Sequence, residues 1–215
     1  MQDNFKYGFP SDKESIKDKN LLTYSAMLVN SHYSKEQVDQ RRFIYYNEMD
    51  KEGMAKIMGV SKRTVNRNIN ALLKTGLLEL IDTKNGCAYK FNYKKDNKFF
   101  VEIENEIMKE LIHTSTNVIA TYVLMKYHLK DGAKRMTQEF IAEEIGLSKS
   151  CRTAVRQITK ILAKLGLIII HKRYEQESVK TEKGIKVIPR EILIYELVDF
   201  EDWKMLDTVI ERKSE

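Results

Sequence analysis

The feature that most constrains this chain is an internal repeat, because two related segments imply two related folded units. Residues 49–62 read MDKEGMAKIMGVSK and residues 136–149 read MTQEFIAEEIGLSK, each with an Ala four residues before a Gly. Both halves also share a T-Y-x-x-M pattern upstream, and KTGLL corresponds to KLGLI downstream. We therefore predict two domains, residues 1–98 and residues 99–215.

Each half has the pattern of a helix-turn-helix. Apolar helices are expected near residues 19–33 and 115–129, and each is followed by a short helix and a glycine-containing turn. Side-chain oxygens that accept first-turn N–H groups favour Asp50 and Thr137 as N-caps of the short helices. Ser61 and Ser148 are predicted to cap the next helices in the same way.

The helix after the first turn has a polar face that suits base recognition. Val65, Ile69, Leu72 and Leu73 follow a 3.6-residue period and are predicted to form one apolar stripe. The opposite face carries Lys62, Arg63, Thr64, Asn66, Arg67 and Asn70. Arginine can bond bidentately to guanine and asparagine to adenine in a major groove. We therefore predict that Arg63, Asn66 and Arg67 read bases of double-stranded DNA.

The second half repeats this pattern with other residues. Its predicted buried stripe is Val155, Ile158, Ile161, Leu162 and Leu165, and its outer face carries Lys149, Arg152, Thr153, Arg156, Gln157 and Lys160. Arg152, Arg156 and Gln157 are predicted to contact a second major groove. The pattern leaves open whether this half reads different bases or mainly grips phosphate. It also leaves open whether three extra residues after Ser148 lengthen the turn or the helix.

Positive charge is concentrated in these two segments. The whole chain has 37 Lys+Arg and 31 Asp+Glu, a formal charge of +6. Residues 53–78 contain five basic residues and no acidic ones, and so do residues 145–170, which leaves −4 for the remainder. A solvated surface helix would mix both signs, so this distribution favours DNA contact over a merely solvated face. For the second half, docking of a protein stays open, because winged helices also serve as protein-docking modules.

A hairpin is predicted to follow each helix-turn-helix, as a wing. In the first half the Asn85-Gly86 dipeptide predicts the turn, and Phe43 to Tyr46 predict the first strand of the wing sheet. The second half has a longer hairpin that ends before Pro189, followed by a separate strand and a short C-terminal helix. Wing cations are predicted to contact phosphates: above all Lys84, Lys90, Lys172 and Arg173, and also Lys94, Lys95, Lys98, Lys180, Lys183 and Lys186. The expected fold class is mostly α with small β-hairpins (α+β), in two tandem winged helix-turn-helix domains.

Several other function classes lack their residue patterns. The sequence has no G-x-x-x-x-G-K-[ST] loop, no G-x-S-x-G elbow and no HxH pair, so we expect no catalytic residues, metal or cofactor. Cys87 and Cys151 lack CxxC spacing and are predicted to be reduced thiols. No apolar stretch approaches the roughly 20 residues of a membrane span, and no secretory signal is recognised. The expected location is the bacterial cytoplasm, on the nucleoid or a plasmid.

The segment from LLTYSAMLVN to INALLKTGLLELI resembles the N-terminal winged-helix domain of replication initiator A-type proteins from plasmids of Gram-positive bacteria. The second half resembles related phage replication proteins. This resemblance implies binding of repeated origin sites, self-association, as in a homodimer, and recruitment of host replication factors. Members usually carry a further C-terminal domain, whereas little follows residue 199 here. A transcriptional regulator, such as a repressor, of a mobile element is the alternative.

Overall fold

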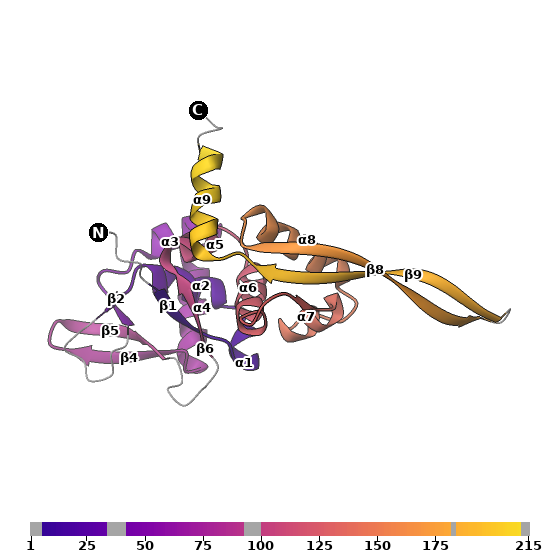
Figure 1. The fold of residues 1–215 in the computed structure, drawn as a ribbon. Helices are drawn as coiled ribbons and strands as arrows, with labels where there is room; N and C mark the ends of the chain where they lie inside the picture. Colours follow the sequence, from indigo (N-terminus) through magenta and orange to yellow (C-terminus); the bar gives the residue numbers. More distant parts are fainter. Residues whose placement is uncertain (1–5, 34–41, 93–99, 182–183, 212–215) are drawn as a thin grey trace. The chain divides into compact units, whose positions relative to one another are not determined.

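The computed structural model describes residues 6–33, 42–92, 100–181 and 184–211 (Figure 1). The chain divides into two compact units, residues 1–123 and 124–215, and the division falls inside helix α6 (Thr116–His128). The domain boundary predicted between residues 98 and 99 involves residues outside the described ranges and stays a prediction.

The first unit combines helices with two antiparallel sheets. Its helices are α1 (Lys13–Ile16), α2 (Leu21–Val29), α3 (Lys51–Ile57), α4 (Lys62–Lys74) and α5 (Asn105–Leu111). One sheet pairs β1 (Lys6–Pro10) with β6 (Phe100–Glu104). The other has the order β2-β3-β5-β4, from β2 (His32–Tyr33), β3 (Arg42–Tyr45), β4 (Leu78–Thr83) and β5 (Gly86–Phe91). The predicted pairing of the segment at Phe43 with the wing is therefore confirmed, since β3 pairs with β5.

Tyr24 lies at the centre of the first unit's core. Its fully buried ring meets Phe9 of β1 and Phe91 of β5 edge to face, with centroids 5.3 and 5.2 Å apart. Such pairs add directional attraction to the burial of large apolar side chains. Helix α2 is therefore held between the two sheets of this unit, and almost all of its residues are buried.

The first helix-turn-helix forms as its caps predict. Asp50 accepts hydrogen bonds from the N–H groups of Glu52 and Gly53, and Ser61 accepts one from Thr64. Gly59 ends the short helix with a φ of 63°, a conformation that residues with a Cβ rarely adopt. The caps fix where α3 ends and where α4 begins.

The second unit contains one three-stranded antiparallel sheet. Besides α6 it has β7 (Lys134–Arg135), α7 (Gln138–Glu144), α8 (Arg152–Lys164), β8 (Ile168–Thr181), β9 (Gly184–Leu197) and α9 (Phe200–Glu211). The strand order is β7-β9-β8. Thr137 caps α7 by accepting from the N–H of Phe140, as predicted.

Ser148 does not cap α8, and that prediction is wrong. The helix starts at Arg152, and its N-cap residue Cys151 makes no side-chain capping bond. The N–H of Cys151 donates to the carbonyl of Ser148 at 2.8 Å, which closes a turn over the inserted residues. The three extra residues therefore lengthen the turn and leave α8 at 13 residues, the same length as α4.

The hairpin of the second unit is one continuous ribbon of two 14-residue strands, and its outer part projects beyond α7 and α8 (Figure 1). The prediction of a break at Pro189 is wrong, because β9 runs through this residue, which pairs with Gln176. Proline fits a strand where its nitrogen faces an unpaired edge. Among the described strands, β7 pairs β9 only at Ile194 and Tyr195, which leaves that edge of β9 open at Pro189.

The expectation of a mostly helical chain is likewise wrong. The described part is 44% helical and 30% strand, with three antiparallel sheets. The excess strand comes from β1, which pairs with a segment far along the sequence, and from a polar stretch of β8 that has no apolar alternation. The element order in each unit, a helix, a short strand, two helices and a hairpin, is compatible with a winged helix.

The start of α9 closes the second unit. The buried Trp203 indole donates a hydrogen bond from Nε1 to the carbonyl of Leu165 at 2.8 Å, and Phe200 stacks on the indole ring. The first turns of α9 therefore pack as part of the second unit. Side chains from residue 206 onward lie outside the described set.

The two serines at equivalent repeat positions provide a stability test. We expect Ser61→Ala to lower the free energy of unfolding by about 1 kcal/mol, because it removes the cap of α4. Ser148→Ala is expected to change the free energy of unfolding by less than about 0.5 kcal/mol, because Ser148 is exposed and caps no helix. Urea denaturation followed by circular dichroism measures both variants. Equal costs at the two sites would contradict the described difference between the turns.

Candidate nucleic-acid interface

The exposed side of α4 carries a row of hydrogen-bonding side chains. Arg63, Arg67, Asn70 and Lys74 are all exposed and recur at helical spacing. Val65, Ile69 and Leu72 are buried on the opposite side, which determines that this row faces outward. Asn66 is half-buried at the margin of the row.

Polar bonds also anchor α4 to the rest of its unit. Asn68 donates from Nδ2 to Oγ1 of Thr23 on α2 at 2.9 Å, which limits rotation of α4 about its axis. Thr64, predicted to face DNA, is half-buried, and its hydroxyl lies 3.0 Å from that of Ser61. Thr64 therefore belongs to the cap of the helix and not to the exposed row.

Lys62 is engaged by a carboxylate of its own unit. Its Nζ lies 2.6 Å from Oε1 of Glu52 on α3. This hydrogen bond and the charge of Glu52 raise the pKa of Lys62. Glu52 therefore holds Lys62 against α3, at the end of the exposed row.

The first wing has its tip one residue earlier than predicted. Thr83 pairs with Gly86, so Lys84 and Asn85 form the turn, and Gly86 follows with a φ of 112°. Lys84 is exposed at this tip. Lys90 lies within β5, with only 15% of its side chain exposed and Glu79 at 4.0 Å, so it is not a tip residue. Lys94, Lys95 and Lys98 lie outside the described residues.

In the second unit, α8 presents its predicted polar face. Arg152, Thr153, Arg156, Gln157 and Lys160 are exposed. Val155, Ile158 and Leu162 are buried beneath them, together with Thr159, which the pattern did not predict. Ile161 was expected in the buried stripe but is 40% exposed. Lys149 is exposed in the turn before α8 and not on the helix.

Carboxylates from other elements pair with these cations. Arg152 Nε lies 2.7 Å from Glu139 of α7, and Lys149 lies 3.2 Å from Glu143. Glu191 of β9 is 3.9 Å from Arg156 and 3.7 Å from Lys172. Residues 145–170 contain no acidic residue, but carboxylates from neighbouring elements lie beside their cations in the folded unit.

The predicted phosphate-contacting cations of the second hairpin that the structure describes are exposed. Lys172 and Arg173 of β8 lie opposite Leu193 and Ile192 of β9, and both are exposed. Lys186 is also exposed. Lys183 and the side chain of Lys180 lie outside the described set.

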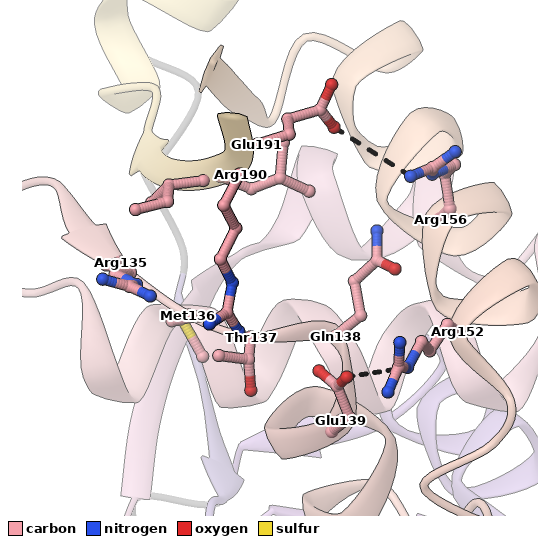
Figure 2. Close-up of a pocket in the computed structure, with 11 residues that line it drawn as sticks. Arg135, Met136, Thr137, Gln138, Glu139, Arg152, Arg156, Arg190 and Glu191 are labelled. Carbon is pink, nitrogen blue, oxygen red and sulfur yellow. Dashed lines mark ion pairs between the residues drawn. The ribbon is translucent and has the colours of Figure 1, made fainter. Parts of the chain in front are cut away.

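A cleft lined by arginines lies beside α8, and sequence reasoning missed two of its residues. Its volume is about 190 Å³, and its lining includes Arg135, Arg152, Arg156 and Arg190 (Figure 2). Arg190 Nη1 is 3.1 Å from both carboxylate oxygens of Glu177, and Arg135 is 3.7 Å from Glu175. Arg190 follows Pro189 in a segment predicted to lie outside the hairpin, so no local pattern placed it near α8. We call this site the arginine cleft.

Other chemistry is sparse in the described part of the chain. It contains no group of three His, Cys, Asp or Glu side chains that could hold a metal ion. Cys87 is an exposed free thiol whose pKa is raised by a hydrogen bond to Asp82. Burial lowers the pKa of His128. Within the same described ranges, no helix has the length and apolar character that crossing a membrane requires.

No protein-family model matches this chain, and no curated protein is significantly similar to it.

The ion pair at the start of α4 can be tested by titration. We expect Glu52→Gln to lower the pKa of Lys62, because the substitution removes the negative charge that stabilises the ammonium form and leaves only a neutral amide oxygen as acceptor. Nuclear magnetic resonance of the lysine side chain across alkaline pH measures this value. A Lys62 pKa that is unchanged in the variant would show that the two side chains do not interact in solution.

Proposed function

We propose that this protein binds double-stranded DNA sequence-specifically and initiates replication of a plasmid or phage. The observation that carries the DNA-binding part is the exposed row of α4, Arg63, Arg67, Asn70 and Lys74, over a fully buried apolar stripe. A helix of this kind fits a major groove, where Arg and Asn distinguish bases by paired hydrogen bonds. The replication part is supported by the sequence resemblance to plasmid initiators.

The two units differ in how available their arginines are. Within the described ranges, neither Arg63 nor Arg67 forms an ion pair, whereas Arg152 and Arg156 both do. Base reading requires guanidinium groups that can meet base edges without first leaving a carboxylate. This contrast supports base reading by α4, with Asn66 at the margin, and a larger phosphate-contacting share for α8 and its hairpin.

The ligand can be identified by selecting genomic fragments with the purified full chain, followed by footprinting. Directly repeated sites in a replication origin are expected, and binding of several copies there would agree with the proposed self-association. A single inverted repeat over a promoter would instead identify a transcriptional regulator. A chain that binds no duplex in a salt-dependent way would be a protein-docking module, and the proposal would fail. If origin sites are selected, the complex on the origin is used to capture host replication factors.

Arg67 is the most informative residue for base reading. We expect Arg67→Ala to weaken binding to the selected site by about 1 to 3 kcal/mol, because a bidentate contact with guanine is lost. Binding to unrelated duplexes should change much less. Fluorescence anisotropy with both duplexes measures the difference. If both affinities fall equally, Arg67 contacts phosphate and not a base.

The two wing lysines of the first unit are expected to behave differently. Lys84→Ala should reduce the dependence of log K on log salt by about 0.9, as for one lost phosphate contact. Lys90→Ala should leave this slope nearly unchanged, because the mostly buried Lys90 lies on β5 beside Glu79. Anisotropy titrations from low to moderate salt measure both slopes. The reverse result would mean that the strand, and not the tip, faces DNA.

A further inference from the structure

The arginine cleft collects positive charge from three separate elements. Its walls are Arg135 to Glu139 across β7 and α7, Arg152 and Arg156 on α8, and Arg190 to Leu193 on β9 (Figure 2). Four of the lining residues are arginines. Each pairs with a carboxylate: Glu139 and Glu191 lie in the lining, and Glu175 and Glu177 lie beside it. An anionic ligand would therefore bind by replacing these carboxylates against the guanidinium groups.

The arginines are accessible from solvent. Their side chains are 48 to 64% exposed, so none is committed to the core. A guanidinium group offers a planar fork of N–H donors that matches two oxygens of a phosphate. Thr137 and Gln138 add a hydroxyl and an amide to the lining, and both can donate hydrogen bonds.

Internal carboxylates now occupy these guanidinium groups. Glu177 accepts from Arg190 with both oxygens at 3.1 Å, and Glu139 lies 2.7 Å from Arg152. Glu175 and Glu191 lie at 3.7 and 3.9 Å from their arginine partners. The carboxylates show that oxyanions fit against these arginines. Exposed ion pairs contribute little net stability, so a phosphate can replace them at small cost.

We propose that the arginine cleft binds a backbone phosphate of duplex DNA, with Arg190 and Arg135 as ligands beside Arg156. The cleft shares Arg152 and Arg156 with the outer face of α8, so a duplex lying against α8 also reaches the cleft. Its volume of about 190 Å³ is below the roughly 300 to 1,000 Å³ of small-molecule pockets. The inference rests on the proposed DNA binding and specifies which part of the DNA the second unit holds.

The test uses the full chain and a random-sequence duplex, with affinity measured by fluorescence anisotropy over a range of salt. Arg190→Ala and Arg135→Ala are each expected to reduce the slope of log K against log salt by about 0.9, as for one lost phosphate contact. Lys134→Ala is the matched control. Lys134 is next to Arg135 on β7 and is also paired with a carboxylate, Asp131 at 3.5 Å, but it does not line the cleft. The control should keep the wild-type slope.

A second variant tests the exchange of carboxylate for phosphate. Glu177→Gln removes the negative charge that holds Arg190 and keeps the size of the side chain. We expect it to bind the same duplex about two- to fivefold more tightly, because the phosphate no longer competes with an exposed ion pair. Unchanged or weaker binding, with the variant folded by circular dichroism, would overturn the proposed exchange.

The outcomes separate this inference from the proposed function. A wild-type chain that binds duplexes with strong salt dependence, while both arginine variants keep its slope, overturns the cleft assignment and leaves DNA binding intact. A wild-type chain without salt-dependent binding overturns both. Inorganic phosphate is the last probe. Its binding to the cleft is measured by nuclear magnetic resonance of the arginine side chains. Weak binding that competes with the duplex supports the assignment, whereas tight binding without competition identifies a free phosphate compound as the ligand and overturns it.

Discussion

Burial of one apolar stripe on α4, and of its counterpart on α8, is the constraint on which the rest of the structure depends. Val65 and Leu72 in the first unit, and Val155 and Leu162 in the second, are fully buried. Burying such side chains contributes about 1.5 to 3 kcal/mol each, far more than any surface ion pair. The polar face of each helix is therefore turned outward as a consequence of core formation. Recognition and stability depend on opposite sides of the same helix.

Features that depend on neighbouring residues were predictable. The caps at Asp50, Ser61 and Thr137 each involve a donor two or three residues away, so the residue type and its spacing were sufficient. Ser148 has the same residue type at the same repeat position, yet it caps nothing, because the insertion moves the start of α8. Alignment of the two repeats shows three inserted residues after Ser148, but it does not show whether they belong to the turn or to the helix.

Features that depend on distant pairing were not predictable. Nothing in the sequence around Arg156 shows that Glu191 will lie beside it, because the alignment of β9 with α8 is set by the whole hairpin. The same holds for Arg190 and Arg135, which no helical periodicity connects. The basic character of both helices was therefore predictable from the sequence. The carboxylates that pair with cations of both helices, and two of the four arginines in the cleft, were not.

Pro189 has a consequence for the behaviour of the protein in solution. A long two-stranded ribbon exposes unpaired backbone groups that can add strands from other molecules, and this ribbon also exposes Tyr174, Ile185 and Val187. Proline supplies no N–H to an incoming strand, and the charged side chains of Glu175, Glu177 and Arg190 surround it. Pro189 fits β9 because this edge of the strand is open there. The proline also disfavours the addition of a further strand at that edge.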